Sequence, residues 1–399
     1  MDVDVVFGTD RCHQLDDPWR DRALALHFER PEEAAAEIAR AAGGAPIHGV
    51  LALGDRPVEA AAHAARALGL PYNSPESVAV ARNKLRQREA LRAAGLPVPA
   101  FFSFPLAADV ESALAHARFP CVIKPLMLSM SQGVVRANTA GEFRAAVSRI
   151  RTLLASPEVQ VTREAGLDRL LVESYVPGAE VALEGLLENG RLRPLALFDK
   201  PDPLEGPYFE ETIYITPSRL ASGMQHAILD CAQRTVNALG LTHGPLHAEF
   251  RVNERGPWVL EAQPRPIGGL CARALRFGRN GMPLEELLAR HALGMDTQGL
   301  EREELASGVM MIPVPRSGTL EGVAGVDDAA RLPGIDLVEI TARLHDYIAA
   351  WPEGSSYLGF IFARADEPAE VESALRAAHA LLRFDLRERL PVEHPLTKR

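Results

Sequence analysis

Two acidic residues in the middle of the sequence are spaced so that they can face each other across a hairpin. Residues 244–252 read as a strand, 253–256 as a turn and 258–265 as the returning strand. Side chains alternate between the two faces of a strand, and a loop of about five residues sets Glu249 opposite Glu261. Opposed carboxylates repel each other unless a cation lies between them, and such hard oxygen ligands suit Mg²⁺ that carries nucleotide phosphates. The alternative is a solvent-facing hairpin of mixed charge.

Further polar residues at alternate positions lie beside these two acids. His247 shares a face with the first acid, and Gln263 and Arg265 share a face with the second. Gly268 and Gly269 follow, and glycines there permit close approach of the backbone to a bound ligand. The simpler interpretation of the two glycines is a plain strand-to-helix turn.

Lysine is rare in this chain, so its positions are informative. Four of the 43 basic residues are lysine, at Lys84, Lys124, Lys200 and Lys398. Where arginine supplies generic charge, lysine marks places that need a compact ammonium, for instance against a phosphate. Lys124 lies in an apolar, strand-like run, and the following loop 128–133 carries hydroxyls and a glycine that can fold over phosphates. The alternative is an edge-strand lysine whose head reaches water, followed by an ordinary hairpin.

A third pattern is a hydrophobic strand that ends in a carboxylate. Residues 170–172 are apolar, Glu173 follows, and after a Pro-Gly turn Glu180 opens the next strand. Backbone between two such strands can offer an adenine its N–H and C=O groups, and a carboxylate there can bind ribose hydroxyls. The alternative is a hairpin with solvated acids.

The elements that must position these residues follow from the apolar pattern. In the first 95 residues we predict strands at 3–7 and 49–53 and helices at 31–42, 57–68 and 83–94. Alternation of strands and helices favours an α/β unit with a parallel sheet. No GxGxxG follows the first strand, so the usual dinucleotide site is not supported.

A Gly-Leu-Pro-Val-Pro segment starting at Gly95 separates this unit from the rest of the chain. The next region is richer in strand-like runs, with helices predicted at 141–154 and 224–239. A last small α/β unit begins near residue 308 and contains a helix from about 368 to 382.

Composition excludes several classes of protein. The chain has 399 residues, 47% of them apolar and 24% charged, which is typical of a soluble globular protein of two to four domains. A net charge of −10 argues against general nucleic-acid binding. No apolar run is long enough to cross a membrane and the first residues do not resemble a signal peptide, so we expect a cytoplasmic protein without a membrane partner. GxxxxGK[ST], HExxH and GxSxG are absent.

Taken in order, the three patterns resemble the ATP-grasp superfamily of carboxylate–amine ligases. The chain is most similar to the L-amino-acid ligase branch, and it also resembles biotin carboxylase in outline. The resemblance implies an α/β fold, α+β in the central module, with a Rossmann-like N-terminal domain at 1–95, an ATP-grasp domain at 96–300 and a small C-terminal α/β domain at 301–399. A smaller lid subdomain is implied at about 118–190.

The resemblance also implies roles for individual residues. ATP phosphates would contact two lysines and a flexible loop, namely Lys84, Lys124, Ser129, Ser131 and Gly133. The adenine hinge and the ribose acid would be Glu173, Val176 and Glu180. The metal ligands would be Glu249, Glu261 and Gln263, where the superfamily usually has Asn at the last position. Catalysis would use Lys124 and Arg265, and the substrate side would comprise His247, Arg265, Gly268, Gly269 and Glu211.

The implied activity is ATP-dependent formation of an amide or peptide bond through an acyl phosphate, with an amino acid as the expected substrate and release of ADP and phosphate. ATP and Mg²⁺ are the implied cofactors, with Mn²⁺ as a substitute. Small carboxylates and amines are the implied partners, along with a homodimer. Two alternatives stay open. One is a biotin-carboxylase-like enzyme that activates bicarbonate, and the other is a nucleotide-binding regulatory protein without catalysis.

Overall fold

A computed structural model describes residues 3–10 and 23–388 of the chain. These residues form two compact units. The first comprises the described parts of Met1–Asp199, Pro203–Phe209 and Ser218–Glu304, and the second comprises those of Lys200–Asp202, Glu210–Pro217 and Leu305–Arg399. Each unit is described by itself below.

The N-terminal part of the first unit is mainly helical. Its elements are β1 (Gly8–Thr9), β2 (Leu24–Ala25), α1 (Pro31–Ala41), α2 (Pro57–Leu68), α3 (Pro75–Arg82) and α4 (Lys84–Ala93). The three predicted helices are confirmed, and the third is preceded by α3. The side chain of Ser74 caps the N-terminus of α3 and that of Asn83 caps α4. Lys84 is therefore the first residue of a helix.

The two strands predicted in this part are wrong. Residues 3–7 and 49–53 are assigned to no strand, and the parallel pair consists of β1 and β2 instead. Val3, Val5 and Val6 are 39%, 64% and 61% exposed. An apolar run becomes a strand of a parallel sheet only where neighbouring elements cover it, and residues 3–7 lack that cover among the described residues.

A four-stranded sheet follows, with the strand order β3-β6-β4-β5. Its elements are β3 (Phe101–Pro105), α5 (Val110–Leu114), β4 (Cys121–Pro125), β5 (Val135–Ala137), α6 (Ala140–Leu154), α7 (Pro157–Gln160) and β6 (Arg169–Ser174). Phe143, Val147 and Ile150 of α6 pack with Ile123 and Val172 of the sheet in one buried cluster. This packing fixes the strand that carries Lys124.

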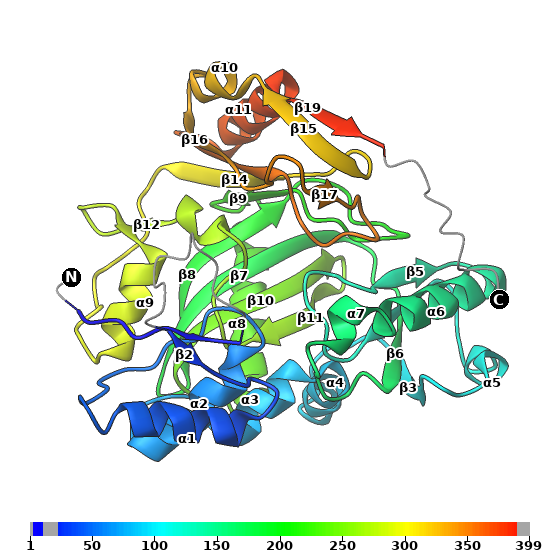
Figure 1. The fold of residues 1–399 in the computed structure, drawn as a ribbon, viewed down its shortest axis with the longest axis horizontal. Coiled ribbons are helices and arrows are strands. Elements are labelled where there is room, and N and C mark those ends of the chain that lie inside the picture. Colours follow the sequence, from blue (N-terminus) through cyan, green and yellow to red (C-terminus); the bar gives the residue numbers. More distant parts are fainter. Residues whose placement is uncertain (1–2, 11–22, 389–399) are drawn as a thin grey trace. The chain divides into compact units, whose positions relative to one another are not determined.

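The larger sheet of the first unit places β10 (Gly244–Asn253) between β7 (Ala179–Glu188) and β11 (Gly256–Gln263), antiparallel to both. β8 (Arg191–Lys200) lies on the other side of β7, and Figure 1 shows these green strands side by side. Helix α8 (Ser222–Leu239) contributes to the same buried cluster as β10. The unit ends with a 3-10 helix (Cys271–Ala274), β12 (Arg276–Phe277), β13 (Met282–Pro283) and α9 (Leu284–Ala292).

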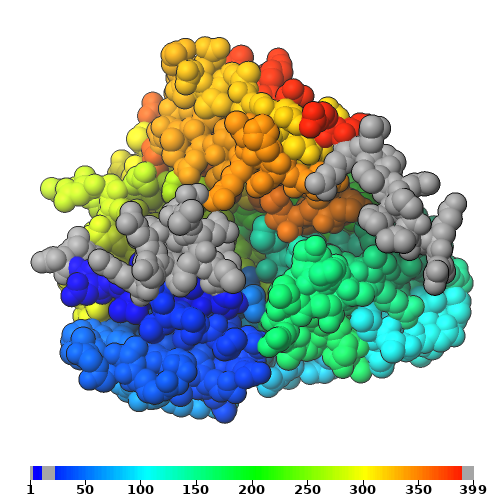
Figure 2. Space-filling view, in the orientation of Figure 1, coloured from blue at the N-terminus to red at the C-terminus, as the bar shows by residue number. Residues whose placement is uncertain are grey.

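The second unit is a small α/β body. β9 (Ile213–Thr216), β14 (Ala306–Ile312), β18 (Gly359–Ala365) and β16 (Ile335–Ile340) pair in that order, and β15 (Gly318–Ala324) pairs with β17 (Tyr347–Ile348) and β19 (Arg383–Arg387). Helix α11 (Pro368–Leu381) buries its apolar side with β14 and β18, and α10 (Val326–Ala330) adds to the same cluster. The predicted C-terminal helix is confirmed. In the space-filling view the orange and red residues of this unit are closely packed (Figure 2).

None of the helices within residues 3–10 and 23–388 is long and apolar enough to cross a membrane.

Candidate active site

The hairpin of β10 and β11 brings the two predicted metal-binding acids together. The Cα atom of Glu249 pairs with that of Glu261, and His247 pairs with Gln263. Leu246, Ala248 and Phe250 are fully buried in the core that includes α8. Because side chains alternate along a strand, the polar residues of β10 must lie on the opposite face. The predicted pairing is confirmed.

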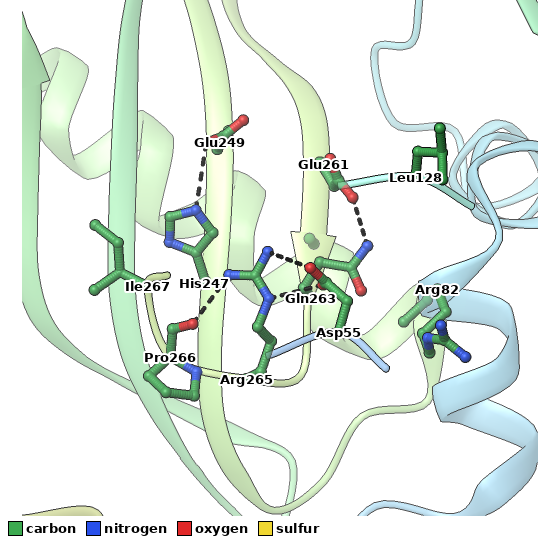
Figure 3. Close-up of polar contacts among 12 residues, drawn as sticks. Asp55, Arg82, Leu128, His247, Glu249, Glu261, Gln263, Arg265, Pro266 and Ile267 are labelled. Carbon is green, nitrogen blue, oxygen red and sulfur yellow. Dashed lines mark hydrogen bonds and ion pairs between the residues drawn. The ribbon is translucent and has the colours of Figure 1, made fainter. Parts of the chain in front are cut away.

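Gln263 carries an oxygen that is buried and unpartnered. The residue is only 2% exposed, and its Nε2 donates to Oε1 of Glu261 over 2.6 Å (Figure 3). Its Oε1 has no hydrogen-bond partner among the described residues. Buried polar atoms in proteins are normally satisfied. Two carboxylates and a carbonyl oxygen are ligands of the kind that Mg²⁺ prefers, so the chemistry of these residues fits the implied metal once the Gln263 amide turns its oxygen, in place of its nitrogen, toward Glu261.

Lys84 lies beside these acids at the start of α4. Its Nζ donates to the carbonyl oxygen of Leu128 over 2.7 Å and lies 3.5 Å from Oε1 of Glu261. Lys84 is 8% exposed. The ammonium therefore links one acid of the hairpin to the first residue of loop 128–133.

Lys124 is held by a buried carboxylate. Oε2 of Glu173 lies 2.6 Å from Nζ of Lys124, and Oε1 of Glu173 accepts from Nε of Arg88 over 2.5 Å. Burial alone would raise the pKa of Glu173, but Arg88 and Lys124 lower that pKa to about 2. Burial lowers the pKa of Lys124, and Glu173 only partly offsets this effect. Both oxygens of the Glu173 carboxylate are thus engaged by cations. An adenine bound beside this segment would therefore meet mainly backbone N–H and C=O groups.

Glu180, the first acid of β7, pairs with Arg251 of β10. Oε2 of Glu180 accepts from Nε of Arg251 over 2.9 Å, and Nη1 of the same arginine donates to the carbonyl of Gly178 over 2.9 Å. Gly178 has φ of +130°, and a Cβ there would lie 2.1 Å from the carbonyl oxygen of Val252. Only glycine allows this close approach, which sets the turn that precedes Glu180. Val176 lies just before this turn and is 9% exposed.

His247 is hydrogen-bonded to carboxylates at both ring nitrogens. Nδ1 contacts Oε1 of Glu184. Nε2 lies 3.3 Å from Oε1 of Glu249 (Figure 3). Burial would lower the pKa of His247, but Glu184 and Glu249 raise that pKa to about 9. Both carboxylate contacts therefore favour the protonated form of the imidazole.

Arg265 forms a two-point ion pair with Asp55 of the N-terminal part. Nε and Nη2 of Arg265 donate to Oδ1 and Oδ2 of Asp55 over 2.8 and 3.3 Å, and Nη1 donates to the carbonyl of Pro266 over 3.0 Å (Figure 3). Burial would raise the pKa of Asp55, but Arg265 lowers that pKa overall. Burial would lower the pKa of Arg265, but Asp55 raises it overall. Both groups are charged and fixed in orientation.

Comparisons with known proteins show to which superfamily the chain belongs. Three family models match the chain. They describe an ATP-grasp N-terminal domain at residues 3–72, an ATP-grasp domain at residues 117–274 and an L-amino acid ligase C-terminal domain 2 at residues 310–387. A D-alanine–D-alanine ligase of Gloeobacter violaceus is 30% identical over 238 residues, which cover 56% of this chain and 72% of that protein. The chain belongs to the ATP-grasp superfamily.

Two further matches refine its place among ATP-grasp proteins. The crystal structure of an L-amino acid ligase from Bacillus licheniformis superposes with a TM-score of 0.79 and 26% identity, covering 96% of this chain and 92% of that one. The protein y4rH of Sinorhizobium fredii is 28% identical over 316 residues, 77% of this chain. The chain spans 62% of the length of y4rH. Within the superfamily, the matched C-terminal domain and this structural similarity relate the chain to the L-amino-acid ligase branch.

The ATP-grasp loop 128–133 is built from tight turns. Met130, Ser131 and Gly133 have φ values of +54°, +51° and +71°. The amide of Gln132 bonds to the carbonyl of Ser129 over 3.1 Å. The hydroxyl residues predicted to contact phosphates therefore lie in a loop that starts at the carbonyl bound by Lys84.

The remaining predicted substrate residues fall into two places. Gly268 and Gly269 follow Arg265 in the first unit, and a Cβ on Gly268 would meet no atom within 4 Å. Glu211 belongs to the second unit, where its Oε1 lies 2.5 Å from Nζ of Lys200 and its Oε2 accepts from the hydroxyl of Tyr214 over 2.6 Å.

Sequence reasoning missed three residues that contact the predicted site residues, Asp55, Arg88 and Glu184. Glu184 had a detectable signal, because it lies four residues after Glu180 in one strand and so shares its face. Asp55 had none, because its partner lies 210 residues away in the sequence.

Proposed function

We propose that this protein is an ATP-dependent ligase that joins a carboxylate to an amine through an acyl-phosphate intermediate, with an amino acid as one substrate. The observation that carries the proposal is the opposed pair Glu249 and Glu261 with the unpartnered oxygen of Gln263 beside it. The similarity to an L-amino acid ligase supports the amino-acid substrate.

The acidic and the basic residues of the site have different proposed roles. Glu249, Glu261 and Gln263 would hold Mg²⁺, which when bound supplies positive charge to the β- and γ-phosphates of ATP. Lys84 and Lys124 add two ammonium groups on the nucleotide side, and both are buried enough to act in a low dielectric. Pre-arranged cations of this kind stabilise the charge that develops during phosphoryl transfer.

The proposed reaction has two steps. A carboxylate oxygen of the first substrate bonds to the γ-phosphorus, the bond from that phosphorus to the β-phosphate oxygen breaks, and ADP leaves. The amine nitrogen of the second substrate then bonds to the acyl carbon, the carbon–oxygen bond to the phosphate breaks, and phosphate and a proton leave. Arg265, fixed by Asp55, would stabilise the acyl phosphate.

The test is release of ADP and phosphate from ATP with Mg²⁺, or with Mn²⁺ in its place, across single amino acids and their pairwise mixtures. We expect release only with particular amino acids, together with a condensed product detected by mass. Glu261→Ala should abolish release while leaving the circular dichroism spectrum unchanged. An active, magnesium-dependent Glu261→Ala protein would refute the metal assignment, and release that depends on bicarbonate alone would replace the proposal with the bicarbonate-activating alternative.

A further inference from the structure

The carboxylate of Glu184 connects two segments of the candidate site that are distant in sequence. Glu184 lies in the middle of β7 and is 2% exposed. One of its oxygens contacts Nδ1 of His247 on β10, and the other accepts from the backbone N–H of Ile267 over 3.0 Å. Both oxygens of a buried carboxylate are therefore engaged by parts of the site.

The contact with His247 determines how that ring is presented. A carboxylate accepts only from a protonated nitrogen, so Nδ1 of His247 carries a hydrogen and the ring cannot flip without losing this bond. With Nδ1 fixed, Nε2 is directed at Glu249, 3.3 Å away. Groups behind a ligand or substrate residue commonly fix its orientation in this way.

The contact with Ile267 holds the segment that carries Arg265. Pro266 has no backbone N–H, so Ile267 provides the first backbone donor after Arg265. The carbonyl of Pro266 accepts from Arg265 itself. Anchoring Ile267 to β7 thus fixes the chain direction between Arg265 and Gly268.

We propose that Glu184 is a positioning residue of the proposed ligase, which orients the imidazole of His247 toward Glu249 and anchors Ile267 beside Arg265. The kinetic part of this inference rests on the proposed function, whereas the two contacts can be tested without turnover. Glu184 contacts neither ATP nor either substrate in this role.

The test compares Glu184→Gln with the matched control Glu188→Gln. Glu188 ends the same strand four residues later, and its carboxylate lies 3.7 Å from Nδ1 of His291 outside the site. The substituted amide in Glu184→Gln keeps the size of the side chain but has a single acceptor oxygen, so it cannot engage both partners as the carboxylate does. We expect kcat to fall by about 10–100-fold, as for other residues that orient active-site groups, with the KM for ATP within about twofold. Glu188→Gln should leave both unchanged.

Two readouts need no activity. The proton on Nδ1 of His247 should give a slowly exchanging, downfield NMR signal that is lost or shifted in Glu184→Gln and retained in Glu188→Gln. Hydrogen exchange at the amide of Ile267 should accelerate in Glu184→Gln alone. If that variant does not fold, Glu184→Asp keeps the charge but withdraws it by one methylene, and the same two changes are expected.

The outcomes separate the two proposals. An unchanged Nδ1 signal and unchanged exchange at Ile267 would overturn the positioning role, as would equal effects of Glu184→Gln and Glu188→Gln. A protein that shows the expected spectral changes but joins no amino acids would contradict the proposed function and leave the positioning role standing.

Discussion

Glu173 on β6 and Lys124 on the neighbouring strand β4 form a buried ion pair with an Oε2–Nζ distance of 2.6 Å. Arg88 of α4 contacts the other oxygen of the same carboxylate. One carboxylate therefore meets two cations, and it joins the small sheet to the helix that begins at Lys84. Lys124, which is proposed to bind phosphates, therefore also contributes to the stability of the fold.

The first prediction concerns acid stability. The pKa of Glu173 is about 2 in the folded state against an ordinary value of 4.5. A lowered pKa stabilises the fold above the unfolded pKa, and this contribution is lost as pH falls from about 4.5 toward 2. A shift of this size corresponds to roughly 3 kcal/mol. We expect urea unfolding to show this loss in the natural protein and a flatter dependence over the same range in Glu173→Gln.

Glu111→Gln is the control for this measurement, because Glu111 pairs with Arg144 on the surface and exposed pairs contribute little. At pH 7, Glu173→Gln should also be destabilised by about 3–5 kcal/mol, since it leaves two buried cations without their anion. Equal pH profiles for the natural protein and Glu173→Gln would contradict the assignment.

The opposition of Glu249 and Glu261 in the hairpin was predicted from the sequence and is present in the structure, but the turn differs from the predicted one. Alternation indicates which side chains share a face, and a loop of about five residues would place Glu249 opposite Glu261. The turn in the structure is shorter, since Asn253 pairs with Gly256, and by itself it would place Glu249 opposite Leu260. A bulge follows between Glu249 and Phe250, where the register shifts. This bulge lies between the turn and the acids, and it restores the pairing of Glu249 with Glu261. No local pattern indicated it.

Other features depend on contacts that no local pattern contains. The sequence placed Glu173 at the end of a strand, but only the packed structure shows that its carboxylate points to Arg88 and Lys124. The strand predicted at 3–7 failed for the related reason that apolar residues form a strand only when other elements cover them. Pairing between residues distant in the chain was therefore the main information that the sequence lacked.

The second prediction concerns the unpartnered oxygen of Gln263. Gln263→Leu removes that oxygen at similar volume, and we expect the Mg²⁺ concentration for half-maximal activity to rise by about tenfold or more. Gln263→Asn should retain activity, because it supplies the same kind of oxygen one methylene shorter. The measurement is phosphate release as a function of free Mg²⁺. The exposed Gln298 provides the control substitution Gln298→Leu, and an equal response of Gln263→Leu and Gln298→Leu would exclude Gln263 as a ligand.

The third prediction concerns the pair of Asp55 and Arg265. Asp55→Asn keeps the shape of the side chain but removes the charge that fixes the guanidinium at two points. Because small displacements of a positioning group are costly in catalysis, kcat/KM should fall about 100-fold. Combining Asp55→Asn with Arg265→Ala should add little to the loss from Arg265→Ala alone. The control is Asp328→Asn, which removes an exposed ion pair with Arg331 in the second unit and should leave kcat/KM unchanged. If the losses from Asp55→Asn and Arg265→Ala are instead fully additive in the double variant, Asp55 acts independently of Arg265.

The last prediction concerns the turn before Glu180. Gly178 has φ of +130°, and an added Cβ would lie 2.1 Å from the carbonyl oxygen of Val252. Gly178→Ala must therefore shift backbone on two strands, and we expect it to lower the free energy of unfolding by about 2–4 kcal/mol. Gly223→Ala is the matched control, because it lies in helix α8 with no atom within 4 Å of the added Cβ, and it should stabilise the protein slightly or leave it unchanged. The measurement is the free energy of unfolding of both variants in urea. A Gly178→Ala protein as stable as the Gly223→Ala protein would show that this close approach does not fix the turn.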